Sequence, residues 1–191
     1  MHAQKVSNQT LMNVSNPDDL KTATFGAGCF WCVEAVYQRL DGVVSLESGY
    51  SGGSLENPTY KEIGTGKTGH AEVVRITYDP AKVSFADLLE VFWITHDPTT
   101  LNRQGNDTGT QYRSVIFFHD EEQEMIAKSS LQAASEAEVY KDPIVTEISP
   151  LINYFPAEAY HQNYYNENSS QPYCFYVIGP KVEKFKKLFK D

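Results

Sequence analysis

The order of strand-like and helix-like segments predicts an α/β (α+β) fold in which one sheet carries its helices on one face. These segments follow one another as β-α-β-β-α-β, which is the order of the split βαβ, ferredoxin-like arrangement. The length of 191 residues suits one domain, and no internal repeat or long linker divides the chain. We therefore expect a polar extension over residues 1–20, followed by a single domain with a mixed sheet over residues 21–191.

The first half of the chain predicts a strand, a helix and two more strands. Residues 22–25 have the composition of a short strand. A helix should follow over residues 33–40, because apolar residues recur there at the i, i+3, i+4 and i+7 spacing. These apolar residues are Val33, Val36, Tyr37 and Leu40. Residues 43–50 and 71–78 predict strands on either side of a Gly-rich loop.

The second half predicts two helices and two strands around a polar loop. Ser84 can cap a helix that runs to His96 and buries Leu88, Leu89, Phe92 and Trp93. Residues 99–110 have almost no apolar side chain, so we expect a loop held between rigid neighbours. Residues 115–118 then predict a strand, Asp120 the start of a helix, and residues 143–148 another strand.

The C-terminal segment predicts a late strand and a closing helix. Residues 175–178 read as the strand. Pro180 suits the first turn of a basic helix, whose lysines we expect in solvent. The side chains expected to face inward are Val182, Phe185, Leu188 and Phe189.

Charge and composition exclude several classes of function. The 16 Lys and Arg against 25 Asp and Glu give a net charge of −9, which opposes nucleic-acid binding. No stretch approaches the roughly 18 consecutive apolar residues of a membrane span, and the hydrophobic content of 41% indicates a soluble globular protein. We therefore expect neither nucleic acid nor a membrane as a partner. No export signal is visible, which favours the cytoplasm.

The sharpest local motif is Gly28-Cys29-Phe30-Trp31-Cys32, because three cysteines are too few and too odd in number for a disulfide scaffold. Cys29 stands where a strand turns into a helix, and the free N–H groups of a helix N-terminus lower a cysteine pKa. Cys32, about one turn later, could reach Cys29 or point into the core. The pair could also be two buried hydrophobic residues, a dithiol oxidoreductase site or half of a zinc site. The bulky Phe30 and Trp31 instead favour a hydrophobic wall for an apolar group of the substrate.

Three further residues have side chains suited to proton donation. Glu72 opens an otherwise apolar strand, and partial burial would raise its pKa enough for it to donate a proton near neutrality. A solvated glutamate at a strand end is the alternative. Tyr60 and Tyr112 end the short motifs NPTY and GTQY, where each hydroxyl could donate to an oxygen or simply pack.

Polar aromatic residues gather near the C-terminus, over residues 160–165 and 171–174. They could simply pack a surface loop. Cys174, however, follows a segment that looks mobile, and this placement suits a thiol that must travel to another sulfur.

Taken together in order, these motifs resemble the peptide-methionine sulfoxide reductase A family. The motifs are GCFWCVE, SGYSGG, NPTY, GHAE, RQGNDTGTQYRS, YHQNYY and QPYC, over about residues 22–190. The resemblance implies a two-layer sandwich with a ferredoxin-like core. It also implies an enzyme that repairs oxidative damage by reducing the S epimer of methionine sulfoxide, free or in peptides and proteins, to methionine.

The resemblance further implies a role for each motif residue. Cys29 would be the nucleophile and Glu72 the proton donor, while Tyr60 and Tyr112 would polarise the sulfoxide oxygen. Asp107 would order the site through hydrogen bonds. The substrate-binding residues would be Phe30, Trp31, His161, Tyr164 and Tyr173. Cys174 matches the usual resolving cysteine, but Cys32 stands where many members have glycine, so either thiol could resolve first.

The implied reaction needs no metal and no organic cofactor. Cys29 would become a sulfenic acid, a second cysteine would condense with it to a disulfide, and thioredoxin or another dithiol would reduce that disulfide. We expect a monomer. The alternatives are a general thiol-disulfide oxidoreductase that uses Cys29 and Cys32, and a non-enzymatic redox-sensing module that binds peptides.

Overall fold

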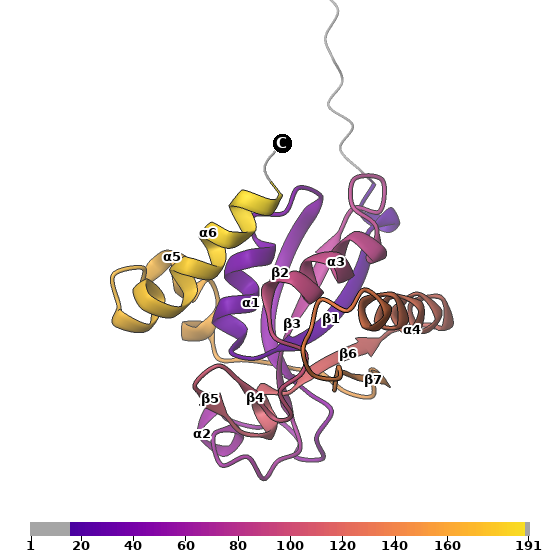
Figure 1. The fold of residues 1–191 in the computed structure, drawn as a ribbon. Helices are drawn as coiled ribbons and strands as arrows, with labels where there is room; N and C mark the ends of the chain where they lie inside the picture. The colour runs from indigo at the N-terminus through magenta and orange to yellow at the C-terminus, as the bar shows by residue number, and fades with distance from the viewer. Residues whose placement is uncertain (1–15, 190–191) are drawn as a thin grey trace, which may run out of the picture.

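The computed structural model describes residues 16–189 and contains a six-stranded mixed sheet (Figure 1). The strands lie in the order β7-β6-β1-β3-β2-β8. Their bounds are β1 (Lys21–Ala27), β2 (Val43–Ser51), β3 (Ala71–Tyr78), β6 (Ser114–Phe118), β7 (Glu147–Pro150) and β8 (Phe155–Pro156). Neighbouring strands are antiparallel except β6 and β7, which are parallel. The predicted mixed sheet is therefore confirmed.

The four strands β6-β1-β3-β2 form the ferredoxin-like part of the sheet. β1 and β2 both pair antiparallel with β3, so they share a direction and are connected through helix α1 (Phe30–Tyr37). β3 and β6 both pair antiparallel with β1 and are connected through helix α3 (Phe85–Thr95). Each connection is a split βαβ unit, which confirms the fold class predicted from the element order.

The main core lies between the sheet and the helices α1, α3, α4 (Glu121–Glu136) and α6 (Gly179–Leu188) (Figure 1). Aromatic and branched aliphatic side chains dominate this core, including Phe25, Tyr37, Phe92 and Ile116. The opposite face of the sheet carries a smaller cluster that Leu151 and Tyr154 cover. Met125, the one methionine within residues 16–189, is 66% exposed on α4.

The predicted helix starts of α3 and α4 are confirmed. Ser84 accepts a hydrogen bond from the amide of Asp87, whose carboxylate accepts one in return from Ser84. Asp120 accepts a hydrogen bond from the amide of Gln123. Both contacts satisfy amide groups that lack a partner within the first turn of a helix.

The predicted late strand is wrong, because Cys174–Ile178 forms a π-helical turn, η4, that continues directly into α6. Cys174 and Ile178 are buried four residues apart, as on one side of a helix, whereas Phe175 and Tyr176 are 64% and 75% exposed. The aromatic and β-branched composition of these residues is typical of a strand, but only the helical spacing fits their burial.

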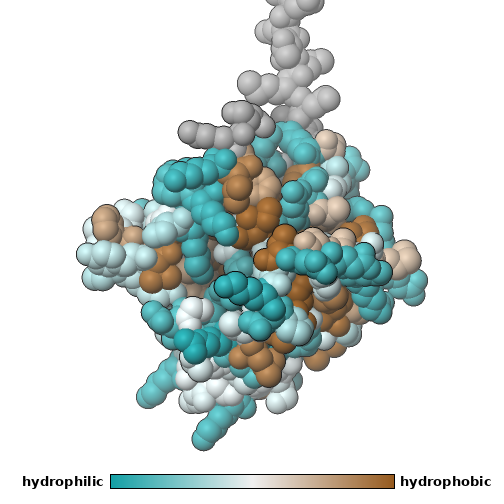
Figure 2. All heavy atoms as spheres, viewed as in Figure 1, coloured by the Kyte–Doolittle hydropathy of each residue, from teal (hydrophilic) through white to brown (hydrophobic). Residues whose placement is uncertain are grey.

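Other expectations also need correction. The strand predicted over residues 143–148 is β7, which begins only at Glu147. Leu188 is 54% exposed instead of facing inward, although Val182 and Phe185 are buried as predicted. Lys184, Lys186 and Lys187 of α6 are exposed, as predicted, whereas Lys181 is half-buried. Figure 2 shows hydrophilic residues along α6, with hydrophobic residues between it and α3. The polar loop contains the hairpin β4 (Arg103–Gln104) and β5 (Asp107–Thr108), followed by the turn η2 (Thr110–Tyr112).

The predicted polar extension falls mostly on residues 1–15, which lie outside the described residues. Pro17–Asp19 form a short 3-10 turn, η1, before β1. Within residues 16–189, no helix has the length and the apolar character that crossing a membrane requires.

Candidate active site

The turn from β1 to α1 places Cys29 at the N-terminus of a helix. Cys29 is the N-cap residue of α1, and its side chain is only 7% exposed. Gly28 before it has a φ of +89°, and a Cβ at that position would lie 2.6 Å from Cγ of Gln104. Only glycine fits this close approach and this backbone conformation without strain. Gly28 therefore allows the tight turn that places Cys29 at the helix N-terminus.

The thiols of Cys29 and Cys32 titrate as a pair. A hydrogen bond from Cys29 lowers the pKa of Cys32 to about 7. Burial, followed by the contact with Cys32, raises the pKa of Cys29. The expected lowering at Cys29 is not found, because burial raises the pKa of its thiol. The first amide of the helix, that of Phe30, donates to Glu72. The two thiols therefore lose their first proton as a pair. The resulting thiolate is stabilised on Cys32, which accepts the hydrogen bond from Cys29.

Glu72 on β3 is buried beside this helix start, with 2% of its surface exposed. Its Oε2 accepts a hydrogen bond of 3.0 Å from the amide of Phe30. Burial raises the pKa of Glu72 to about 8. The carboxyl group therefore holds a proton at neutral pH and can donate it, whereas the solvated glutamate considered above does not fit this burial.

Tyr60 and Tyr112 lie within electrostatic reach of Cys29 and Glu72. Tyr60 begins helix α2 (Tyr60–Ile63), which a capping box between Thr59 and Glu62 starts, and Tyr112 ends η2. Burial and then the charge of Glu72 raise the pKa of both hydroxyl groups. Both hydroxyl groups therefore remain protonated and available as donors.

Tyr173 connects the β4–β5 hairpin to the cysteine pair. Its hydroxyl donates a hydrogen bond of 2.6 Å to Oδ2 of Asp107 and lies 3.9 Å from Sγ of Cys32. Burial raises the pKa of this hydroxyl. Asp107, expected as an ordering residue, is thus joined to the thiols through one side chain.

Cys174 is fully buried in η4, although its position in the sequence predicts a mobile segment. Burial and then the charge of Cys32 raise its pKa. Cys29, Cys32 and Cys174 are all free thiols. Cys32 therefore lies within electrostatic reach of both other cysteines.

The aromatic residues of the sequence motifs form one continuous wall. Trp31 and Tyr164 stack with ring centroids 3.8 Å apart and planes 7° apart. Phe30 is fully buried, and its ring centroid lies 5.1 Å from that of His161. Tyr173 meets Trp31 edge to face at 6.0 Å. All five predicted substrate-binding residues are thus in contact around Trp31.

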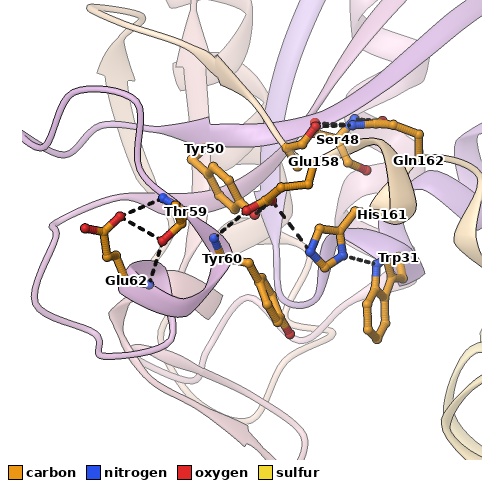
Figure 3. A network of polar contacts seen from close by, with 10 residues as sticks. Trp31, Ser48, Tyr50, Thr59, Tyr60, Glu62, Glu158, His161 and Gln162 are labelled. Atoms are coloured by element: carbon orange, nitrogen blue, oxygen red, sulfur yellow. Dashed lines mark hydrogen bonds and ion pairs between the residues drawn. The ribbon is translucent and has the colours of Figure 1, made fainter.

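A polar network that the sequence did not reveal supports this wall (Figure 3). Glu158 accepts hydrogen bonds of 2.8 Å from the amide of Tyr60 and from the hydroxyl of Tyr50. Its Oε2 lies 3.7 Å from Nε2 of His161, whose Nδ1 accepts a hydrogen bond of 3.1 Å from the indole of Trp31. Burial lowers the pKa of His161, so its ring is neutral. The only sequence signal for Glu158 is its position three residues before His161.

Glu34, the last residue of the GCFWCVE motif, is a second residue that the sequence did not single out. It is buried on α1, and its Oε1 accepts a hydrogen bond of 3.0 Å from the amide of Asn163. Asn163 has a φ of +56° and precedes helix α5 (Tyr164–Glu167). Glu34 therefore holds the start of the helix that carries Tyr164. Within residues 16–189, no three His, Cys, Asp or Glu side chains are grouped as metal ligands would be.

Comparison with known proteins identifies the family. Residues 21–191 match the family model described as peptide methionine sulfoxide reductase. The peptide methionine sulfoxide reductase MsrA of Polynucleobacter asymbioticus is 53% identical over 176 residues, which cover 92% of this chain and 93% of the relative. Two solved structures are also similar. The reduced form of Mxr1 from Saccharomyces cerevisiae is 33% identical over 83% of this chain and 91% of that chain, with a TM-score of 0.78.

The second solved structure is Mxr1 from Saccharomyces cerevisiae in complex with Trx2. It is 24% identical over 78% of this chain and 87% of that chain, with a TM-score of 0.56, and shares the fold. The matches to the family model and to MsrA cover nearly all of the chain that holds the thiol, the carboxyl group and the aromatic wall. The chain therefore belongs to the peptide methionine sulfoxide reductase family and is a methionine sulfoxide reductase.

Proposed function

We propose that this enzyme reduces the S epimer of methionine sulfoxide, free or in peptides and proteins, to methionine through a sulfenic acid on Cys29. The observation that carries the proposal is the buried carboxyl group of Glu72, which is bound to the helix amide next to Cys29 and has a pKa of about 8. This contact supports a site in which a nucleophile, Cys29, and a proton donor, Glu72, lie side by side. Residues 21–191 form the catalytic domain in this proposal.

In the first step, sulfur attacks sulfur. The Cys29 thiolate attacks the sulfoxide sulfur while Glu72 gives its proton to the sulfoxide oxygen. The hydroxyl groups of Tyr60 and Tyr112 donate to the same oxygen and stabilise the charge that develops on it. The protonated oxygen then moves from the substrate sulfur to Sγ of Cys29 as the new sulfur–sulfur bond breaks, which leaves Cys29 as a sulfenic acid and releases methionine.

The substrate's methyl group lies against the aromatic wall. Trp31 presents an indole face that Tyr164 backs from the other side, and the buried Phe30 closes the base. Such a surface suits an apolar methyl beside a polar sulfoxide oxygen. The indole ring of Trp31 is held in one orientation by its edge-to-face contact with Tyr173 and its hydrogen bond to His161.

In the second step, a resolving thiol condenses with the sulfenic acid, water leaves and a disulfide forms. Cys32 is hydrogen-bonded to Cys29 and has a pKa of about 7, which supports its attack first and a later transfer of the disulfide to Cys174. Direct attack by Cys174 is the other route. Thioredoxin or a similar dithiol then reduces the disulfide by exchange, as the Mxr1 complex with Trx2 suggests for this fold.

The proposed steps use side chains of one chain and an external dithiol, and we propose a monomer that needs no cofactor. Activity tests the proposal directly. Purified protein with dithiothreitol should convert the S epimer of a methionine sulfoxide substrate to methionine. If no methionine forms, the proposed function is wrong, and reduction of insulin disulfides instead would favour a general thiol-disulfide oxidoreductase.

A further inference from the structure

We infer that Glu158 is a positioning residue for Trp31, and that it acts by fixing which ring nitrogen of His161 carries the proton. The inference rests on the proposed role of Trp31 as the wall for the substrate's methyl group. Figure 3 shows the three side chains in line, from the carboxylate through the imidazole to the indole. Glu158 itself does not reach the wall, so its effect must pass through His161.

The indole of Trp31 determines the state of His161. An indole N–H can only donate a hydrogen bond, so Nδ1 of His161, 3.1 Å away, must accept. A neutral imidazole that accepts at Nδ1 carries its proton on Nε2. The side chain of His161 is 1% exposed, so solvent does not stabilise either form of the ring. The protein must therefore supply the preference.

Glu158 adds to the preference that the indole sets, because it faces the other ring nitrogen of His161. Nε2 of His161 has no hydrogen-bond partner among the described residues, and the oxygen that faces it is Oε2 of Glu158 at 3.7 Å. At this distance the attraction between the N–H and the carboxylate is electrostatic. The nearby rings of Phe30, Tyr60 and Tyr160 offer the imidazole no charged acceptor. The carboxylate therefore favours the proton on Nε2.

The two oxygens of Glu158 are both committed. Oε1 accepts from the amide of Tyr60, and Oε2 accepts from the hydroxyl of Tyr50 while it faces His161. Although burial acts in the opposite direction, the amide of Tyr60 lowers the pKa of Glu158, so the group is a carboxylate at neutral pH. One carboxylate thus ties β2, α2 and the turn η3 (Ala159–His161) together.

Replacing one oxygen by an amide nitrogen would reverse the hydrogen-bond direction. In Glu158→Gln the remaining oxygen must stay with Tyr60, because a backbone amide cannot accept. The new NH2 group then faces Tyr50, whose hydroxyl can rotate to accept, and Nε2 of His161. The imidazole is driven to move its proton to Nδ1, where it opposes the indole N–H of Trp31. Two donors then face each other in a buried site.

The first test measures the proton position without substrate. Nitrogen NMR of the wild-type enzyme with labelled histidine should show His161 protonated on Nε2, and Glu158→Gln should move the proton to Nδ1. A wild-type ring protonated on Nδ1 overturns the inference, even if the variant does not fold. An unchanged tautomer in a folded Glu158→Gln also overturns it.

The second test measures the effect on the substrate. Glu158→Gln should raise KM about 5- to 30-fold, because the buried indole N–H of Trp31 loses its acceptor on His161. The value of kcat should change little, because Trp31 contacts the bound substrate and takes no part in the chemical step. Glu121→Gln, on the exposed first turn of α4, is the matched control and should change neither. An unchanged KM in a folded Glu158→Gln overturns the inference.

A double-mutant cycle separates the route through His161 from a route through Tyr60. In a His161→Phe background, where Trp31 has already lost its acceptor, Glu158→Gln should add little to KM. The same rise in both backgrounds overturns the inference. Trp31→Ala tests the proposed wall separately: an unchanged KM there refutes the wall, while the NMR result still decides the role of Glu158.

Discussion

At the scale of single residues, burial decides where the protons of this site lie. Glu72 is enclosed beside the first amide of α1, and its pKa rises to about 8 because the charged form loses its water. The pKa of Cys32 is lowered instead, because the thiol of Cys29 donates a hydrogen bond to it. Near pH 7 a neutral acid therefore lies beside a cysteine pair that loses its first proton from Cys32. The proposed chemistry then requires Cys29 to pass its own proton to Cys32 as it attacks.

The Glu72→Gln variant tests the acid. The amide has a similar shape but no proton to give, so sulfenic acid formation in a single turnover should slow by roughly 10²-fold or more. In the wild type the protonated carboxyl group is the active form, so the rate should fall as the pH rises through about 8. The rate should also fall below about pH 7, where the cysteine pair takes up the proton that its thiolate has lost. Rapid-quench measurements across this range check both points, and an unchanged rate in the variant removes Glu72 as the acid.

The resolving thiol can be identified by counting thiols. After one equivalent of substrate, the wild type and Cys174→Ser should each lose two free thiols if Cys32 resolves first. Cys32→Ser should then resolve more slowly, because Cys174 starts from a fully buried position. Titration with a thiol reagent at timed intervals distinguishes the routes. A Cys174→Ser enzyme that stops at the sulfenic acid would show that Cys174 acts directly.

The candidate catalytic residues could be proposed from the sequence because each belongs to a short motif of distinctive composition. Their partners could not. Glu158 meets the amide of Tyr60 across 98 positions of the chain, and Glu34 meets Asn163 across 129. No local pattern encodes such contacts, since they depend on how β2 and the C-terminal turns are brought together by the fold.

At the scale of elements, the turn between β1 and α1 controls the thiol. Gly28 combines a positive φ with close contact to Gln104, which belongs to the β4–β5 hairpin. The hairpin thus packs directly against the residue before Cys29. The sequence predicted the strand, the turn and the helix here, because glycine, cap position and apolar spacing agree. It did not predict η4, where composition and spacing disagree.

Gly28→Ala should destabilise the fold and impair catalysis together. The added Cβ would lie 2.6 Å from Cγ of Gln104 in a strained conformation, which costs about 1–3 kcal/mol and displaces Cys29. Gly105→Ala is the matched control, since Gly105 also has a positive φ but its Cβ would meet nothing within 4 Å. Urea unfolding should show a larger loss for Gly28→Ala. Equal losses would mean that the contact with Gln104 is unimportant.

At the scale of the whole molecule, the reduced enzyme keeps its three cysteine thiols away from solvent. Cys29 is 7% exposed and Cys174 is not exposed at all. An external dithiol must touch the disulfide that it reduces, so the proposed cycle requires a more open oxidised form. The π-helical turn η4 is the suitable place for opening, because it carries Cys174 and its hydrogen-bond pattern departs from that of the adjoining α6.

Hydrogen exchange can detect this opening. Oxidation by one equivalent of substrate should speed the exchange of backbone amides over residues 172–179 relative to the reduced enzyme. Cys29→Ser treated with the same substrate provides the control, since it forms no disulfide. Equal exchange in the oxidised wild type and in the control would show that formation of the disulfide does not open this turn.

The makeup of the core has a consequence for the enzyme's own survival. Within the described residues, methionine occurs only at Met125, on the surface of α4, while rings and branched aliphatic groups fill the interior. Conversion of a buried methionine to its sulfoxide places a polar group in an apolar interior and disrupts packing. A catalyst that works while oxidants are present gains tolerance from this arrangement. Within residues 16–189 there is no buried thioether whose oxidation would loosen the fold.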